Sequence, residues 1–440
     1  MTTFDHILPK LAAILGQHAE GLESLGPVLV NLDLNGRVRL VVDEPLGASP
    51  QAKALLHTIT SAMKADLGRH AYPPERAVLF EPDVHAVSAG LPTYPLERAD
   101  GTLLPGVRVV DRLVTESNWA SIEPVSTGVP RVVFFSIKGG VGRSTALAAT
   151  AWALAQAGRR VLVLDLDLES PGLSSALLPS ERRPEFGIAD WLVEDLVGNG
   201  EAVLDGLWAT STLARDGEIR VVPAHGRDPG EYVSKLGRVW MPRVGSDGVR
   251  ENWSQRLHRL IELLEDRHQP DVILIDSRAG IDEVASSCVT DLGAGLVLLF
   301  AIDGEQTWSG YRILFEHWRK SGVAIDIRER LQLVGAMIPD VNEVDYFDGL
   351  RERGADLFTE QLYDEVLAGQ VDPQRWSFDA HDESAPHYPW AIRWHRGFAA
   401  LRSLHNRLET VDAAEVQAIF GPLVDGVTDF VSSSGEQHGH

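Results

Sequence analysis

A glycine-rich segment between an expected strand and an expected helix constrains this chain more than any other feature. The segment is Lys138-Gly139-Gly140-Val141-Gly142-Arg143-Ser144-Thr145. The apolar residues 131–137 before it are typical of a buried strand, and residues 146–157 after it are typical of a helix. Backbone N–H groups of such a turn and the positive end of the helix dipole converge on one spot. The segment therefore predicts a phosphate-binding turn.

This turn departs from the strict P-loop pattern G-x-x-x-x-G-K-[ST] at two positions. Ile137 stands at the first glycine position, Arg143 stands at the lysine position, and Lys138 precedes the paired glycines. The arrangement resembles the deviant Walker A motif, KGGxGK[ST], of the ParA/MinD/ArsA (SIMIBI) group of P-loop NTPases. In that group the early lysine reaches the partner's nucleotide across a dimer. The resemblance therefore implies a cross-dimer catalytic role for Lys138.

Composition is that of an ordinary globular protein. Of 440 residues, 44% are apolar and 23% are charged, and the length suits about two to three domains. No apolar run reaches the ~18–20 residues that span a bilayer, and no signal-peptide pattern is evident. The single cysteine, Cys288, excludes an intrachain disulfide framework. We expect a cytoplasmic protein with no membrane partner.

The charge balance is strongly acidic, with 63 acidic against 40 basic residues and a formal net charge of −23. Binding to a phosphate backbone needs clustered lysine and arginine. The basic patches here, such as Arg159-Arg160 and Arg182-Arg183, are short. We therefore expect no nucleic-acid partner.

Two domains and a short tail are expected along the chain. Residues 1–124 predict a small α/β module of unknown role, with a hairpin signal at Asn35-Gly36 and a Pro/Gly-rich loop over 90–106. Residues 125–430 predict the nucleotide-binding domain. Residues 431–440 are polar, which predicts a disordered tail.

The second domain is expected to be a doubly wound, mostly parallel α/β sheet. Apolar runs typical of strands buried on both faces alternate with helical patterns such as 253–264 and 307–318. These runs are 161–164, 219–222, 272–275, 296–302 and 331–338. Ligands bind such a sheet at the carboxyl ends of its strands.

Two acids end the strand that follows the P-loop helix. Asp165 and Asp167 are two positions apart and therefore face the same way. Paired carboxylates beside a phosphate loop can hold Mg²⁺ waters or orient an attacking water, and their mutual approach raises proton affinity. The resemblance implies that Asp167 positions the water. The alternative is that both acids cap the next loop.

A second acid-ended strand, 272–276, precedes the loop Ser277-Arg278-Ala279-Gly280. It resembles the Walker B and switch II segment of MinD-like proteins, usually D-S-P-A-G, with Arg278 in place of proline. The resemblance implies that Asp276 lies beside Mg²⁺ while the Ser144 hydroxyl and Asp165 help to hold the ion. Gly280 would let a backbone N–H approach the γ-phosphate.

The resemblance assigns these residues to three roles. Those expected to act in catalysis are Lys138, Asp167 and Arg143. Those expected to bind nucleotide are Lys138, Gly139, Gly140, Val141, Gly142, Arg143, Ser144, Thr145, Asp165 and Gly280. Those expected at the metal are Ser144, Asp276 and Asp165.

Arg143 is the departure with the largest chemical consequence. Arginine is planar and forked, so it cannot occupy the place of lysine unchanged, although it can still neutralise phosphate charge. Normal hydrolysis, slow hydrolysis and binding without turnover all stay open. Together with Glu169-Ser170-Pro171-Gly172-Leu173, it resembles a bacterial branch with KGGVGR variants. We expect a slow ATPase.

Base recognition is left open between two residues. In ParA and MinD relatives an asparagine after a late strand reads adenine, and here Asp340 or Asn342 follows the strand 331–338. The resemblance favours ATP, with GTP not excluded.

The pattern as a whole predicts a nucleotide-controlled dimerisation switch. Two subunits would close on ATP and Mg²⁺, and the closed homodimer would control a protein partner that the sequence does not identify. The alternatives are an ATP-sensing scaffold without turnover and a ParA-type DNA-partitioning ATPase.

Overall fold

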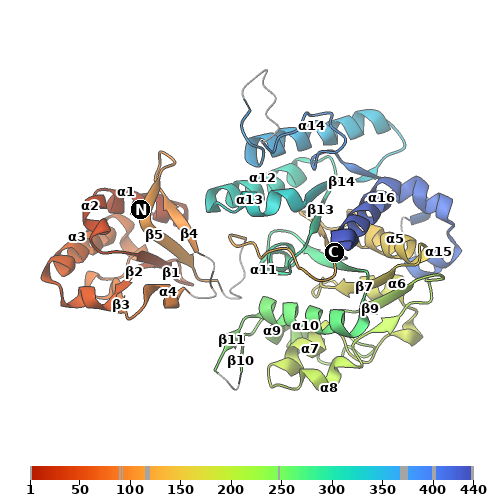
Figure 1. Cartoon of the computed structure of the whole chain (residues 1–440), viewed down its shortest axis with the longest axis horizontal. Coiled ribbons are helices and arrows are strands. Elements are labelled where there is room, and N and C mark those ends of the chain that lie inside the picture. The colour runs from red at the N-terminus through yellow and green to blue at the C-terminus, as the bar shows by residue number, and fades with distance from the viewer. Residues whose placement is uncertain are drawn as a thin grey trace. The chain divides into compact units, whose positions relative to one another are not determined.

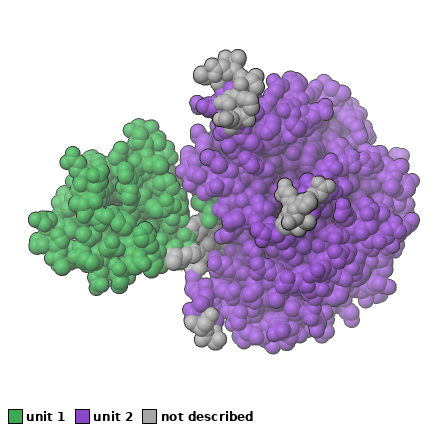
Figure 2. Space-filling view, viewed as in Figure 1, with its two compact units in different colours: residues 1–121 green, residues 122–440 purple. Residues whose placement is uncertain are grey.

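The computed structural model describes residues 2–88, 91, 93–113, 119–245, 248–366, 375–398 and 403–437. The chain divides into two compact units, Met1–Ser121 and Ile122–His440, which are coloured separately in Figure 2. Each unit has its own hydrophobic core. No helix among the described residues is long and apolar enough to cross a membrane.

The first unit is built on a mixed five-stranded sheet in the order β3-β2-β1-β5-β4 (Figure 1). Its strands are β1 (Val28–Leu32), β2 (Val38–Asp43), β3 (Val78–Glu81), β4 (Thr93–Glu97) and β5 (Leu103–Asp111). β1 and β2 pair antiparallel, as the Asn35-Gly36 signal predicts, and Gly36 takes the positive φ of 69° that this tight turn needs. The predicted hairpin is confirmed.

Helices cover one face of this sheet. They are α1 (Ile7–Gly16) and α3 (Pro50–Leu67), with the shorter α2 (Ala19–Glu23). The short helix α4 (Val84–Val87) packs on the opposite face, where Val84 joins Leu29, Val41 and Val110. Side chains of α1 and α3 share one core with the inward residues of the sheet. The loop predicted over 90–106 is wrong in part, because β4 and the start of β5 lie there. The two strands pair antiparallel across Gly101, so the Pro/Gly signal marks a hairpin turn and not a long loop.

The second unit holds an eight-stranded sheet in the order β15-β14-β13-β6-β12-β7-β9-β8. Every neighbouring pair is parallel except β8 with β9. The strands are β6 (Arg131–Ser136), β7 (Arg160–Asp165), β8 (Ala209–Thr210), β9 (Glu218–Val222), β12 (Val272–Ala279), β13 (Leu296–Ala301), β14 (Leu331–Ile338) and β15 (Trp390–Arg393). The expected α/β fold with a mostly parallel sheet is confirmed.

Helices pack on both faces of this sheet because successive side chains of its buried strands point to opposite sides. Phe134 of β6 lies in the core shared with α5, whereas its neighbour Phe135 contacts Tyr311 of α12, ring centroids 6.2 Å apart. The long helices are α5 (Arg143–Gln156), α10 (Trp253–His268), α12 (Glu305–Ser321), α14 (Glu343–Gln361) and α16 (Ala413–Gln437). The shorter elements are α6 (Leu173–Leu177), α7 (Ile188–Asp195), α8 (Gly200–Leu204), α9 (Tyr232–Val239), α11 (Glu283–Ser286), α13 (Ala324–Ile327), α15 (Leu404–Thr410) and the two-residue strands β10 (Arg243–Val244) and β11 (Arg250–Glu251).

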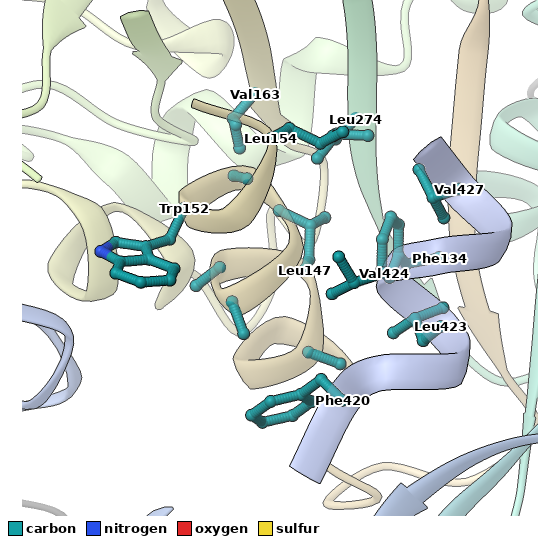
Figure 3. Close-up of a cluster of buried hydrophobic side chains, with 14 of the residues drawn as sticks. Phe134, Leu147, Trp152, Leu154, Val163, Leu274, Phe420, Leu423, Val424 and Val427 are labelled. Atoms are coloured by element: carbon teal, nitrogen blue, oxygen red, sulfur yellow. The ribbon is translucent and has the colours of Figure 1, made fainter. Parts of the chain in front are cut away.

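The C-terminal helix α16 docks against the P-loop helix α5. Figure 3 shows Phe420, Leu423, Val424 and Val427 of α16 beside Leu147 of α5. This packing continues past Val424, and Val431 is only 3% exposed.

The disordered tail predicted over 431–440 is therefore wrong for residues 431–437, which belong to α16. The serines that suggested disorder sit within the last helical turns. Their hydroxyls donate to backbone carbonyls one turn earlier, as Ser432 does to Thr428. Residues 438–440 lie outside the described part of the chain.

Candidate functional site

The phosphate loop lies at the carboxyl end of β6, in the middle of the eight-stranded sheet. Gly140 and Gly142 have φ values of 76° and 82°, which glycine adopts without strain. A Cβ atom added at Gly139, Gly140 or Gly142 would meet no described atom within 4 Å. The loop is thus an open cradle. The helix α5 begins at Arg143, so its first N–H groups are directed at this cradle.

Arg143 is held inside the site by three hydrogen bonds. Its Nε donates to Oδ1 of Asp276 over 2.7 Å, and its Nη2 donates to Oδ2 of Asp167 over 3.1 Å. Its Nη1 donates to the Ser136 hydroxyl over 3.1 Å. The side chain is only 7% exposed. The planar guanidinium therefore links the ends of three adjacent strands, β6, β7 and β12, through three separate nitrogen atoms.

The carboxylate of Asp276 is shared between two neighbours on α5. Besides Arg143, it accepts a hydrogen bond from the Ser144 hydroxyl at Oδ2 over 2.6 Å. Asp276 lies opposite Asp165 in the parallel register of β12 and β7. The three acids expected from sequence, Asp165, Asp167 and Asp276, thus meet at one edge of the sheet beside the phosphate loop.

Asp165 is the most perturbed of these acids. It is fully buried, and neither of its carboxylate oxygens has a hydrogen-bond partner among the described residues. Burial raises the pKa of Asp165 to about 8, and the nearby carboxylates of Asp276 and Asp167 add to the rise. Asp165 therefore keeps its proton at neutral pH in the absence of a cation.

Burial and their mutual charges both shift the pKa values of Arg143 and Asp167. Burial raises the pKa of Asp167, and the charge of Arg143 offsets part of this rise. Burial alone would lower the pKa of Arg143, but Asp276 and Asp167 raise it. The guanidinium thus stays charged in the site.

Lys138 has a different environment from Arg143. It is exposed, at the start of the glycine turn. Within the described residues its ammonium group has no hydrogen bond or ion pair. The Lys138 side chain is therefore open to solvent in this structure.

The Gly280 amide, expected from sequence to approach a phosphate, has a partner within the sheet. The φ of Gly280 is 104°, which suits glycine only, and its N–H donates to the Ser136 carbonyl over 2.9 Å. The strand β12 continues through Ala279, which pairs with Ser136 of β6. The Gly280 amide is therefore used by the sheet, and it is not free to meet a phosphate in this conformation.

Sequence reasoning missed a link between the two loops that follow the acids. Arg278, which replaces the family's proline, pairs with Glu169 over 2.7 Å and with Asp282 over 3.1 Å. Asp282 in turn caps α11 by accepting from the amides of Val284 and Ala285. The unusual charge at 278 was the available signal, but only the adjacency of β7 and β12 shows that Glu169 is its partner.

A small apolar cavity of about 80 Å³ adjoins the phosphate loop at Val141 and Gly142. Met337, Trp394 and Phe398 line it together with Gly142 and Thr145. Met337 has a φ of 56°, a conformation that is uncommon for a residue with a Cβ and that is typical of functional sites. Asp340 and Asn342, the two expected base readers, are exposed and do not line this cavity. No sequence signal marked Met337.

The donors fit a cation that is bound jointly with phosphate. No group of three or more His, Cys, Asp or Glu residues in the described part of the chain forms a complete metal site. Ser144 and Asp276 nevertheless face each other, and Asp165 lacks a partner for both oxygens. Mg²⁺ takes one or two protein oxygens and completes its shell with water and phosphate. The residues present suit such an ion.

A family comparison places this geometry among known proteins. Residues 132–379, more than half of the chain, match the CobQ/CobB/MinD/ParA nucleotide binding domain. The chain belongs to this family. Its phosphate loop, its two acid-ended strands and its parallel sheet are therefore those of a ParA/MinD-type P-loop nucleotide-binding domain, and the resemblance drawn from sequence is confirmed.

Solved structures show distant similarity to this CobQ/CobB/MinD/ParA family member. The pNOB8 ParA bound to nonspecific DNA is 17% identical, with a TM-score of 0.42, over 70% of this chain and 99% of that chain. The Pyrococcus horikoshii OT3 septum site-determining protein MinD complexed with Mg-ADP is 18% identical, with a TM-score of 0.40, over 70% and 98%. The Mycobacterium smegmatis cobyrinic acid a,c-diamide synthase with bound ATP analogue and magnesium is 21% identical, with a TM-score of 0.36, over 51% and 80%.

These identities and TM-scores are low, so the family assignment rests on the match over residues 132–379. Among curated proteins, none matches this chain.

Proposed function

We propose that this family member is a nucleotide-dependent dimerisation switch. Two subunits bind ATP with Mg²⁺, close on each other, and in the closed state control a protein partner. The observation that carries the proposal is the position of Lys138. Its charge is exposed and has no partner among the described residues at the edge of an open phosphate cradle, whereas Arg143 supplies the charge inside the same site.

Some residues of the site would bind the phosphates and Mg²⁺, and others would orient those ligands. The glycine turn and the first turn of α5 would hold the phosphates through backbone N–H groups. Ser144 would provide the hydroxyl ligand to Mg²⁺, while Asp276 orients that hydroxyl. When bound, Mg²⁺ supplies charge neutralisation at the β- and γ-phosphates. Asp165 would give up its proton beside the cation, because a nearby positive charge favours the carboxylate.

Slow turnover is supported by the way that Arg143 engages Asp167. Asp167 is the family's water-positioning acid, and here its Oδ2 accepts from Arg143. A carboxylate that is tied to a guanidinium is a weaker proton acceptor than a free one. Hydrolysis through Asp167 would then require Arg143 to turn toward the phosphates first, which slows the reaction.

The same contacts support a second candidate, an ATP sensor without turnover. If Arg143 stays on Asp167 and Asp276 when ATP binds, Asp167 stays engaged and does not orient the attacking water. Phosphate release in a single turnover separates the two functions. A measurable rate that disappears in Asp167→Asn supports the switch, and the absence of release over hours supports the sensor.

The deciding experiment is the solution mass measured by light scattering without nucleotide, with ADP·Mg²⁺ and with ATP·Mg²⁺. We expect the mass to double only with ATP, and Lys138→Ala to stay monomeric while it still binds nucleotide. Lys320→Ala, an exposed lysine on α12, is the matched control and should behave like the unmodified chain.

A monomer under all three conditions would overturn the dimerisation switch. Doubling that persists in Lys138→Ala would remove the cross-dimer role of that lysine. Parallel titrations with ATP and GTP would establish the base preference. Salt-sensitive DNA binding by the ATP-bound form would favour the third alternative, a DNA-partitioning ATPase, over a switch that controls a protein partner.

A further inference from the structure

A second, larger cavity adjoins the phosphate loop, and apart from Ser144 and Thr145 its lining has no role in the function proposed above. It has a volume of about 690 Å³, within the range of small-molecule sites. Ser144 and Thr145 at the start of α5 form one wall, so the cavity begins at the phosphate site itself. The remaining walls come from α6, the segment 178–183 after it, and α15, which packs against both α6 and α5 (Figure 1).

The walls combine apolar side chains with a larger share of polar and charged groups. Leu173, Ala176 and Leu178 from the α6 region face Phe398 and Leu404 across the cavity. The polar groups of the lining include Ser175, Ser180 and Ser403, and the hydroxyls of the first two already bond locally, to Gly172 and Glu181. The cavity therefore offers both apolar contact and hydrogen-bonding groups to a ligand.

Arg183 is the group in this cavity that lacks a partner. Its guanidinium has no hydrogen bond or ion pair with any described residue, and its Nε is buried from solvent. The side-chain amide of Asn406 on α15 is likewise without a partner among the described residues. A buried N–H donor without an acceptor lowers the stability of the folded chain. Binding of an acceptor to the Arg183 guanidinium would remove that cost.

The neighbouring charges do not supply that acceptor. Glu181 also lines the cavity, but it is exposed and accepts from the Ser180 hydroxyl. His405 is buried, with its Nε2 3.3 Å from the Thr212 hydroxyl and its Nδ1 3.8 Å from a Glu409 carboxylate oxygen. Arg183 is thus the positive group that the cavity offers to an incoming ligand.

We propose that this cavity is a binding site for an anionic group, phosphate or carboxylate, of a small molecule that lies beside the bound nucleotide. Arg183 would bind the anion with its planar fork, and Asn406 would donate a further hydrogen bond. The apolar side chains of Leu173, Ala176 and Leu178 in the lining would contact the uncharged body of the ligand. The anion belongs either to a separate molecule or to a second phosphate on the sugar of the nucleotide.

The first arm of the test treats the ligand as a separate molecule. The full chain is saturated with a non-hydrolysable ATP analogue and Mg²⁺, so that the phosphate loop is filled, and is then titrated calorimetrically with inorganic phosphate and with citrate. The second arm compares adenosine 3′,5′-bisphosphate with adenosine 5′-monophosphate. Binding in the first arm identifies a separate ligand, and a preference for the bisphosphate in the second arm identifies the sugar phosphate.

In whichever arm shows binding, Arg183→Gln should raise the Kd at least about tenfold, because it removes a charged hydrogen-bond donor. Arg182→Gln, the exposed neighbour, is the matched control and should change the Kd less than about twofold. Asn406→Asp places a carboxylate in the cavity and should also weaken binding. Neither arm showing binding, or an equal Kd in Arg183→Gln, overturns the proposal.

The failure of this site is distinguishable from failure of the switch. Arg183 makes no contact that holds the phosphate loop, so Arg183→Gln should bind the ATP analogue like the unmodified chain. If the analogue does not bind at all, the proposed switch fails. The anion titration of the nucleotide-free chain, repeated with Arg183→Gln, would still report on the cavity.

Discussion

Arg143 and Asp276 form a buried ion pair, with 2.7 Å between Nε and Oδ1, at the point where the phosphate loop meets the strand β12. The side chains of Arg143 and Asp276 are only 7% and 1% exposed. Solvent therefore does not weaken this ion pair as it would weaken one at the surface. Arg143, which stands at the usual P-loop lysine position, is therefore bound to the acids Asp276 and Asp167. Its side chain does not extend into the open phosphate loop.

Replacing Arg143 by lysine should speed up hydrolysis. A lysine cannot reach Asp276, Asp167 and Ser136 together, so Asp167 would be released to orient water. General-base catalysis contributes about 10²–10⁴-fold, so we expect at least about a tenfold faster single-turnover phosphate release. Arg319→Lys, an exposed position on α12, serves as the control. A slower reaction with unchanged nucleotide affinity would show instead that Arg143 itself stabilises the reacting phosphates.

The buried Asp165 should make the stability of the nucleotide-free chain depend on pH. Its pKa is about 8 in the folded chain against an ordinary 3.8, so the folded state holds a proton that the unfolded state loses between these values. Its contribution to the free energy of unfolding is therefore greatest at acid pH and falls as the pH rises from about 4 to about 8. Asp165→Asn, which cannot ionise, should be more stable relative to the unmodified chain at pH 8 than at pH 5, by on the order of 3 kcal/mol.

Urea unfolding at pH 5 and pH 8 measures this difference. Asp216→Asn, at an exposed position, corrects for the general effect of removing one acid. An equal stability gap at both pH values would mean that Asp165 is ionised in the folded chain.

The Glu169–Arg278 pair should affect turnover more than stability. Both side chains are more than a quarter exposed, so breaking the pair should cost less than about 1 kcal/mol of unfolding free energy. The pair nevertheless ties the loop after Asp167 to the loop after Asp276. We expect Glu169→Gln and Arg278→Gln each to change kcat several-fold, and the double variant to be no worse than the more affected single variant.

The Arg267–Asp205 pair is an exposed ion pair of similar length, 2.6 Å, away from the acids of the site. Arg267→Gln is therefore the matched control and should leave kcat unchanged. Additive effects of the two loop variants would contradict coupling between the loops.

The docked C-terminal helix should be required for stability. Leu423 is fully buried between α16 and α5, and Leu423→Ala leaves a cavity there (Figure 3). Such truncations cost about 2–5 kcal/mol, which thermal or urea unfolding detects readily. Asp429→Ala, on the exposed side of the same helix, should change stability by less than about 0.5 kcal/mol. Equal effects of the two variants would mean that α16 is not packed as described.

Patterns within single segments predicted most of the fold. The strand 331–338 is predicted with the bounds that the structure has, and the Asn35-Gly36 turn joins β1 and β2 as expected. Errors arose where polar composition was taken for a lack of structure. Ser432 and its neighbours are helical because Val427 and Val431 beside them are buried, which is a property of the tertiary packing.

In the candidate site too, some residues could be predicted from sequence motifs, whereas other contacts are visible only in the structure. Lys138, Asp165, Asp167 and Asp276 were found from their places in a motif or at a strand end, and the structure brings the three acids together because adjacent parallel strands end at one edge. The partners of Arg143, the Glu169–Arg278 pair and the cavity at Arg183 had no such signal. Except for the contact of Arg143 with Ser136, each of them depends on residues that are tens of positions or more apart in the chain.

The sequence alone determined that this chain has a phosphate loop of the ParA/MinD type, set in a mostly parallel sheet with acids at the strand ends. Local periodicity and motif spacing carry that information, because strands and turns follow from neighbouring residues. The tertiary structure decided how the charges are used. It pairs Arg143 with Asp276 and Asp167, leaves Lys138 exposed, and gives the Gly280 amide to Ser136. Those outcomes depend on strand order and burial, which fix distances and dielectric surroundings that no segment contains by itself.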